Sequence, residues 1–152
     1  MFMIRPRILA LVALGFITGA PGFAAEPHSH GGAAAPVQLQ LDHGKKWRTD
    51  DALRQGMSGI HLAMEQSLPP IHNKTFTPAQ YEALAERIQG QIDYVVGNCK
   101  LPEEADQQLH LVLERMIDGV AQMKAETGRE QGAVQIVEAL GLYRDYFEPA
   151  GW

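Results

Sequence analysis

The stretch FTPAQYEALAERIQGQIDYVV, residues 76–96, contains the clearest helix start in the chain. Thr77 stands where an N-cap is expected, Pro78 occupies the first helical position, and Gln80 completes a capping box. Phe76 and Tyr81 have the spacing of a hydrophobic staple across this boundary. The apolar residues that follow recur at helical steps: Leu84, Ile88, Ile92 and Val95. We therefore expect a helix that begins at Thr77 and ends near residue 98.

Three more segments carry apolar stripes of the same period, and breakers separate them. The earliest is expected from about Asp50 to Ser67, ended by Pro69-Pro70, with the stripe Leu53, Met57, Ile60 and Met64. The next is expected from Pro102 to about Glu126, with the stripe Leu109, Leu113, Met116, Val120 and Met123. The last is expected from about Arg129 to Phe147, with Val137, Leu140, Arg144 and Phe147 on one face and Val134 and Ile136 beside it.

No segment alternates as a strand does. Four helices joined by short loops predict an all-α fold, an up-down-up-down antiparallel four-helix bundle. Glycine recurs inside the expected helices, at positions 56, 59, 90, 119, 132 and 141, and each such glycine costs about 1 kcal/mol relative to alanine. Two interpretations stay open. The glycines belong to a closely packed or marginally stable bundle, or some of them make room for a bound group.

The first 24 residues have the order of a cleavable export signal. Arg5 and Arg7 precede an apolar run from Ile8 to Ala20, and small residues follow. The run is about thirteen residues long, short of the roughly twenty that cross a bilayer, so we expect it to be removed and not kept as an anchor. Cleavage after Ala24 satisfies the preference for small residues before the cut. The mature chain should then reach the bacterial periplasm without a membrane span.

The chain is expected to divide into a signal peptide (1–24), a disordered leader rich in Ala, Pro, Gly and His (25–41), and the four-helix bundle (42–152). Removing Arg5 and Arg7 with the signal changes the formal net charge from −5 to −7. An acidic chain is a poor partner for nucleic acid or an anionic membrane surface. The sequence predicts no particular oligomeric state.

Methionine and histidine recur on the first and third expected helices. These two helices would run parallel, so residues equally far from the helix starts share a height. The candidate metal ligands then form two adjacent layers: Met57, His61 and His110, and next to them Met64 and Met116. Thioether and imidazole together suit copper, above all the reduced ion. The methionines also lie on stripes that need apolar residues, so core packing is the competing interpretation.

Non-covalent haem is a further hypothesis, because Met57 or His110 could serve as an axial ligand. Two observations weigh against it: the second and fourth expected helices contain no histidine, and a lone Cys99 cannot form the Cys-x-x-Cys-His attachment run. For Cys99 itself two interpretations stay open. It is a small buried loop residue, or its thiol has a pKa lowered by the following helix and Lys100 and is reactive.

No catalytic set, phosphate loop or pair of carboxylates on an apolar face is recognisable, so we expect no enzymatic activity. The run Lys45-Lys46-Trp47-Arg48 precedes the first helix. Trp47 is expected to pack over the bundle end while the charges stay in solvent; the alternative is docking of a protein partner. The function hypotheses are therefore copper binding, an adaptor that binds a protein partner in the cell envelope, and haem binding.

Two stretches resemble a group of exported proteobacterial proteins labelled DnrO-like. One is Asp42-His43-Gly44-Lys45-Lys46-Trp47 with Thr49-Asp50 and Leu53-Arg54-Gln55-Gly56-Met57. The other is Asn98-Cys99-Lys100-Leu101-Pro102 with Ala105-Asp106 and Leu109-His110. The resemblance extends over about residues 42–147. It implies an exported helical protein and no particular activity.

Overall fold

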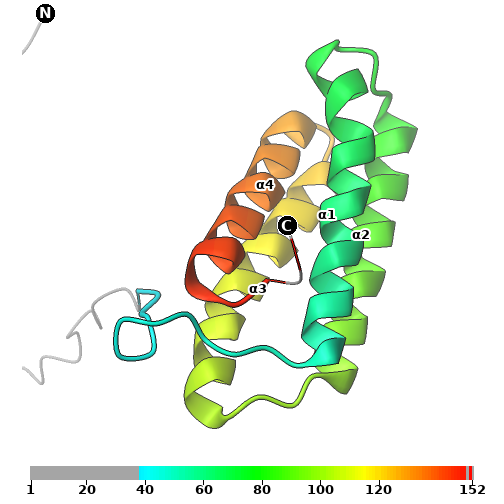
Figure 1. Cartoon of the computed structure of the whole chain (residues 1–152). Coiled ribbons are helices and arrows are strands. Elements are labelled where there is room, and N and C mark those ends of the chain that lie inside the picture. The colour runs from blue at the N-terminus through cyan, green and yellow to red at the C-terminus, as the bar shows by residue number, and fades with distance from the viewer. Residues whose placement is uncertain (1–37, 150, 152) are drawn as a thin grey trace, which may run out of the picture. The chain divides into compact units, whose positions relative to one another are not determined.

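The computed structural model describes residues 38–149 and 151, and this part of the chain is all-α, with four helices and no strand. The helices are α1 (Asp51–His72), α2 (Pro78–Asn98), α3 (Glu103–Lys124) and α4 (Arg129–Tyr146) (Figure 1). The predicted signal peptide and residues 25–37 of the predicted leader lie outside the described residues. None of the helices in the described part has the length and apolarity that a membrane crossing requires.

The start of α2 follows the sequence prediction in detail. The Thr77 N–H donates to Gln80 Oε1 at 2.8 Å, and the Gln80 N–H donates back to Thr77 Oγ1 at 3.3 Å. Pro78 is the first helical residue. The rings of Phe76 and Tyr81 meet edge to face with centroids 4.8 Å apart, which confirms the predicted contact across the boundary. The first turn of a helix leaves four backbone N–H groups without a partner inside the helix. Here the Thr77 side chain accepts from one of them, the Gln80 N–H.

The predicted end of α1 is wrong. The helix does not stop before the proline pair but continues through Pro69 and Pro70 to His72. The two prolines remove two backbone donors, and the residues whose carbonyls lose these donors, Glu65 and Gln66, are both exposed. Ile71, 3% exposed, joins the core and anchors the last turn. The packing of Ile71 in the core therefore outweighs the helix-breaking tendency of Pro69 and Pro70.

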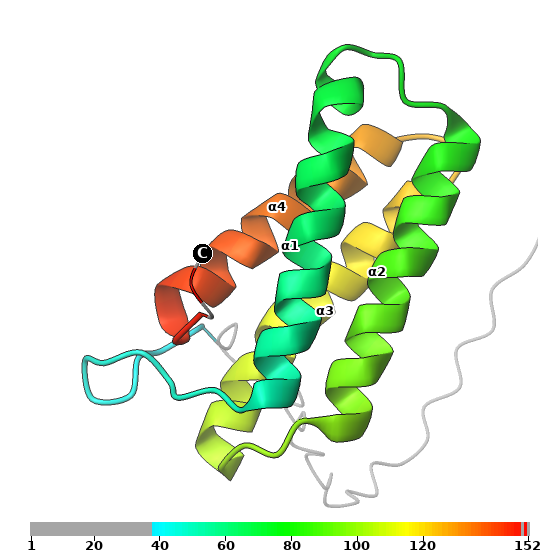
Figure 2. The ribbon, with the colours of Figure 1, turned by 45° about the vertical axis from the view of Figure 1, so that its right-hand side comes forward.

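One apolar core draws on all four helices. The stripes predicted for α1, α2 and α3 are buried throughout. Figures 1 and 2 show α1 beside α2, and α3 beside α4. The contact between α3 and α4 is the most extensive, and that between α1 and α4 is the smallest of the four helix pairs that pack together. The seam between α1 and α4 is therefore the least closed side of the domain.

The buried face of α4 differs from the predicted one. Val137 is 40% exposed, and Arg144 is exposed as well, while Ile136 and Tyr143 are fully buried. Leu140 and Phe147 of the predicted face are buried as expected, so the buried face is shifted only in part, toward Ile136 and Tyr143. The cause is close contact with α3: a Cβ on Gly132 would lie 2.6 Å from the Gly119 carbonyl oxygen. Backbones can approach this far only where both helices lack a side chain.

An arm, residues 38–49, joins the two ends of the described chain. The Trp47 N–H donates to the Tyr146 carbonyl at 2.8 Å, and the Glu148 N–H donates to the Trp47 carbonyl at 2.9 Å. The Trp47 ring packs on the core, and its Nε1 donates to the Gln40 carbonyl. Gln40 in turn contacts Gln108 of α3. Leu39 and Gln40, which precede Asp42, therefore also contact the helical part of the chain.

Candidate functional site

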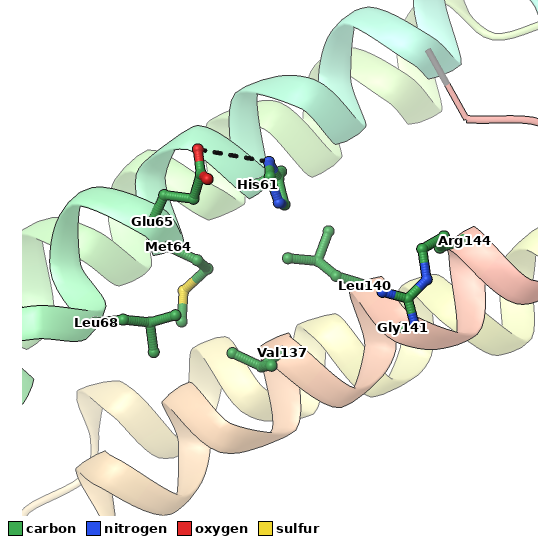
Figure 3. Close-up of a pocket in the computed structure, with 8 residues that line it drawn as sticks. All are labelled: His61, Met64, Glu65, Leu68, Val137, Leu140, Gly141 and Arg144. Atoms are coloured by element: carbon green, nitrogen blue, oxygen red, sulfur yellow. Dashed lines mark ion pairs between the residues drawn. The ribbon is translucent and has the colours of Figure 1, made fainter. Parts of the chain in front are cut away.

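A groove lies between α1 and α4, on the least closed side of the domain. Its volume is about 270 Å³. Figure 3 shows the residues that line it: His61, Met64, Glu65 and Leu68 from α1, and Val137, Leu140, Gly141 and Arg144 from α4. Val137 and Arg144 lie on the exposed face of α4, while Leu140, 5% exposed, belongs to the core. The groove therefore lies where the buried face of α4 meets its exposed face.

Polar contacts join α1 and α4 at both ends of the groove. Beyond the end of α1, Lys74 Nζ donates to both carboxylate oxygens of Glu130 in the first turn of α4, at 2.6 and 2.5 Å. At the other end, Thr49 Oγ1 donates to the Glu148 carbonyl at 2.8 Å. The groove lies along the seam between the Lys74–Glu130 contact and the Thr49–Glu148 contact.

Gly141 contributes no side chain to the α4 side of the groove. A Cβ built on this residue meets no atom within 4 Å, so a larger side chain would have room. A glycine in the middle of a helix costs about 1 kcal/mol relative to alanine. Four of the other helical glycines are explained by packing, because a Cβ on them would collide with a neighbour: Gly56, Gly59, Gly119 and Gly132. Neither close approach nor a positive φ explains Gly141.

The lining mixes apolar and charged side chains. Figure 3 places Met64, Leu68 and Val137 together with Glu65 beside Met64, and Arg144 at the opposite end. The His61 Nδ1 lies 3.8 Å from Glu65 Oε2, and Figure 3 marks this ion pair. The Arg144 Nε lies 3.4 Å from Asp145 Oδ1, and the Arg144 side chain is 59% exposed. The groove thus combines an apolar pocket with a fixed positive charge.

The five predicted metal ligands are distributed over three environments. His61 and Met64 line the groove together. Met57 and Met116 are fully buried in the core. His110 lies on α3 with its side chain 63% exposed, and its Nδ1 is 2.8 Å from the Asp106 carbonyl oxygen. Only the His61 and Met64 side chains of the predicted set therefore share a cavity that a ligand can enter.

Acidic and thiol ligands do not add to this set. Within residues 38–149 and 151, no group of three or more His, Cys, Asp or Glu side chains is placed to hold a metal ion. A metal site of the kind predicted from the sequence would combine imidazole with thioether. The pair that meets this description in the groove is His61 with Met64, one helical turn apart.

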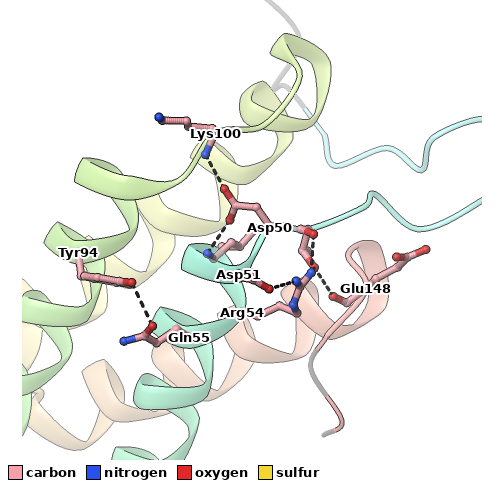
Figure 4. A network of polar contacts seen from close by, with 9 residues as sticks. Asp50, Asp51, Arg54, Gln55, Tyr94, Lys100 and Glu148 are labelled. Carbon is pink, nitrogen blue, oxygen red and sulfur yellow. Dashed lines mark hydrogen bonds and ion pairs between the residues drawn. The ribbon is translucent and has the colours of Figure 1, made fainter.

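The interpretation of Cys99 as a reactive thiol is not supported by its surroundings. Burial, followed by the negative charge of Asp50, raises the pKa of the Cys99 thiol from 9.0 to about 12. Figure 4 shows Asp50 at the centre of the adjoining polar network. Its carboxylate accepts from the Leu53 N–H at 2.8 Å and from the Lys100 N–H at 2.6 Å. The thiol therefore lies beside a structural carboxylate, which disfavours the thiolate.

Sequence reasoning missed Glu65, Leu68 and Gly141 as parts of one cavity. One signal was present: Arg144 falls within the stripe predicted to be apolar on α4, and an arginine rarely belongs in a core. Gly141 was recognised as a glycine inside a helix, with a bound group as one explanation. Neither signal identifies the helix on the other side of the groove.

Comparison with known proteins adds no relative. A scan against protein-family models, a search of curated proteins and a search of solved structures each found no match to this chain. The resemblance to the DnrO-like group therefore stays a prediction, and the argument for function depends on the geometry of the chain itself.

Proposed function

We propose that this chain is an exported, non-enzymatic binding protein whose ligand site is the groove between α1 and α4. One observation carries the proposal. The groove has a mixed apolar and charged lining and is kept open by Gly141, at a position where a larger residue would fit. Most small-molecule sites are concave and apolar with a few placed polar groups. The groove has this character.

The topology that we infer for this site is an up-down-up-down antiparallel bundle. The short connections, residues 73–77, 99–102 and 125–128, support it, because such loops join antiparallel neighbours. In this topology α1 and α4 are adjacent, and their facing stripes form one wall each. The residues near the N-terminal end of one helix then face those near the C-terminal end of the other.

Export remains part of the proposal. The charged, apolar and small-residue order of residues 1–24 supports a cleavable signal and a periplasmic location. The decisive measurement is the mass of the protein recovered from the periplasm of an expressing bacterium. A chain that begins at Ala25 is the expected result, and an uncleaved chain retained in the cytoplasm would refute the export hypothesis.

The binding hypothesis is tested with an uncharged, apolar fluorescent probe such as N-phenyl-1-naphthylamine. The probe should bind the purified domain saturably, and Gly141→Leu, which fills the groove, should abolish the signal. Gly90→Leu is the matched control, because a Cβ on Gly90 also meets nothing within 4 Å and lies on the exposed face of α2. Equal probe binding by the two variants would exclude the groove as the site.

Copper is a second candidate ligand, favoured by His61 and Met64 lining the same groove. Imidazole and thioether are ligands that Cu(I) accepts. A competition titration of Cu(I) against a chelator should show weaker binding by His61→Ala and Met64→Leu, and unchanged binding by His110→Ala. Equal loss in His110→Ala would favour the five-residue site that the sequence predicts. Unchanged affinity in all three variants would remove the copper hypothesis.

A further inference from the structure

Arg144 places a positive charge at one end of the groove, and binding of an uncharged apolar ligand would not need this charge. Arginine is charged at all physiological pH values and binds carboxylates through two parallel hydrogen bonds. The contact of Arg144 with Asp145 is made by Nε alone, at 3.4 Å between neighbours in sequence. The guanidinium end therefore keeps donors for a second anionic partner.

The opposite end of the groove is suited to a hydrocarbon chain. Met64 is 1% exposed and Leu140 is 5% exposed, and both belong to the core, while Val137 is 40% exposed at the groove. A ligand that covers Val137 would remove apolar surface from water, which stabilises the complex by about 25 cal/mol for each Å² buried. Methionine also adapts its shape to different apolar partners. Glu65, which lies between Met64 and Leu68 on α1, also lines the groove, so a carboxylate borders this end.

The dimensions of the groove limit the size of the ligand. From Val137 to Arg144 is seven residues of α-helix, which rise roughly 10 Å, about the length of an extended eight-carbon chain. The volume of about 270 Å³ is just below the range of about 300–1,000 Å³ that drug-sized ligands occupy. A small, elongated molecule fits these dimensions, and a folded protein domain does not.

We propose that the groove binds short aliphatic carboxylic acids, with the carboxylate on Arg144 and the hydrocarbon chain toward Leu68 and Val137. This inference rests on the proposed function and specifies its ligand. The space beside Gly141 admits the chain, since a side chain at that position would occupy it. Glu65 also lines the groove, and its carboxylate lies 3.8 Å from His61 Nδ1, a contact that offsets its negative charge when the imidazole is protonated.

The net charge of the whole chain works against binding of an anion. The formal charge of −5 repels a carboxylate at long range. At 0.15 M ionic strength the Debye length is about 8 Å, so this repulsion is screened and the nearby Arg144 dominates. Binding should therefore be measured at physiological ionic strength and should weaken at low salt, opposite to the behaviour of a simple positively charged surface.

The test is a titration of the ¹⁵N-labelled protein with octanoate and, separately, with uncharged octanamide, followed by NMR chemical shifts. We expect saturable shifts centred on α1 and α4 around the groove, with octanoate binding about tenfold more tightly than octanamide, because a hydrogen-bonded charge contributes roughly 1.5–3 kcal/mol. Arg144→Gln should remove that preference. Arg115→Gln, an exposed arginine on α3, is the matched control.

The outcomes separate the two proposals. If octanoate and octanamide bind equally in the wild-type protein, or octanoate shifts residues outside the groove, the carboxylate assignment is wrong while groove binding is judged by the neutral probe. If neither ligand causes shifts, the proposal is overturned even where the neutral probe binds. Loss of the preference in Arg115→Gln as well as Arg144→Gln would show a nonspecific charge effect.

Discussion

Asp50 connects three parts of the chain through one carboxylate. It caps α1 by accepting from the Leu53 N–H, and it accepts from the Lys100 N–H in the α2–α3 connection. Burial alone would raise the pKa of Asp50, but these donors and the nearby Cys99 and Arg54 lower it below its ordinary 3.8. A carboxylate that accepts backbone hydrogen bonds favours its charged form. The residue thus stabilises the fold in its ionised state.

Asp50→Ala should lower the free energy of unfolding by about 2 kcal/mol at pH 7, the sum of a lost cap and an unsatisfied donor. Because the folded pKa is lower than the unfolded one, the contribution is present above the unfolded value and is lost as the pH falls through the folded value. The advantage of the wild type over the variant should therefore shrink below about pH 4. Urea denaturation across this pH range is the measurement.

Asp51→Ala is the control for this experiment. The Asp51 side chain is 99% exposed, and it forms an ion pair with Arg54 within the same turn. A surface ion pair of this kind contributes little, so the loss should stay within about 0.5 kcal/mol. Equal losses in the two variants would mean that the Asp50 carboxylate has no special role.

Cys99 should be slow to react. With a thiol pKa of about 12, the thiolate fraction near neutrality is small, and we expect alkylation by iodoacetamide at pH 8 to be about tenfold or more slower than that of glutathione. Asp50→Ala should accelerate it, because a negative charge that opposes the thiolate is removed. A folded wild-type protein that reacts as fast as glutathione would contradict the buried environment described here.

At the scale of the helices, the contact between α3 and α4 depends on two glycines. A Cβ on Gly119 would lie 2.9 Å from the Gly132 carbonyl oxygen, and one on Gly132 would lie 2.7 Å from the Met123 nitrogen. These are backbone atoms, which cannot move aside as a flexible side chain does. The two helices would have to separate to admit even one methyl group at either position.

Gly119→Ala and Gly132→Ala should each lower the free energy of unfolding by about 1–3 kcal/mol through overpacking, although alanine is the better helix former by about 1 kcal/mol. Gly90→Ala, where a Cβ meets nothing within 4 Å, should instead raise it by about 0.5–1 kcal/mol. Chemical denaturation of the three variants gives the comparison. A gain in stability in all three would contradict the close α3–α4 approach.

The presence of four helices could be predicted from the sequence, but some of the residues at which they end could not. The cap of α2 is set by residues adjacent in sequence, so its bonds could be predicted from Thr77, Pro78 and Gln80. The end of α1 was predicted wrongly, because Ile71 contributes to the core beyond Pro69-Pro70 and that contribution is a tertiary one. The buried face of α4 was predicted correctly at Leu140 and Phe147 but not at Val137 and Arg144, since the close contact with Gly119 involves a residue of another helix.

For the molecule as a whole, the arm joins the beginning and the end of the described chain. Trp47 contacts the core, and its backbone pairs with that of Phe147 as a parallel bridge. The sequence prediction that Trp47 packs over the end of the domain is confirmed. A contact between residues this far apart in sequence is gained only when the entire domain is folded.

Trp47→Ala should therefore lower the free energy of unfolding of the whole domain by roughly 2 kcal/mol, less than for a fully buried tryptophan because the ring is half exposed. Arg48→Ala should change it by less than about 0.5 kcal/mol, since this neighbour is exposed. Thermal and urea denaturation monitored by circular dichroism give both values. If the two variants are equally stable, the arm does not contribute to the cooperative unit.

The candidate site was only partly predictable. The sequence identified His61 and Met64 as residues of chemical interest, and it raised a bound group as one reason for glycine inside a helix. It grouped them with Met57, His110 and Met116 on the assumption that equal heights on α1 and α3 bring side chains together. The structure instead places Met57 and Met116 in the core and leaves His110 exposed on α3.

The sequence by itself determined that the described chain has four helices, which residues cap α2, and which stripes of α1, α2 and α3 are buried, because those features follow from spacing and adjacent side chains. Only the tertiary structure decided the extension of α1, the burial of Ile136 and Tyr143 in place of Val137 and Arg144 on α4, and the groove that Arg144 and Gly141 line. The physical reason is that each depends on contacts between residues of different helices. No periodicity within a single helix encodes how closely another backbone approaches it.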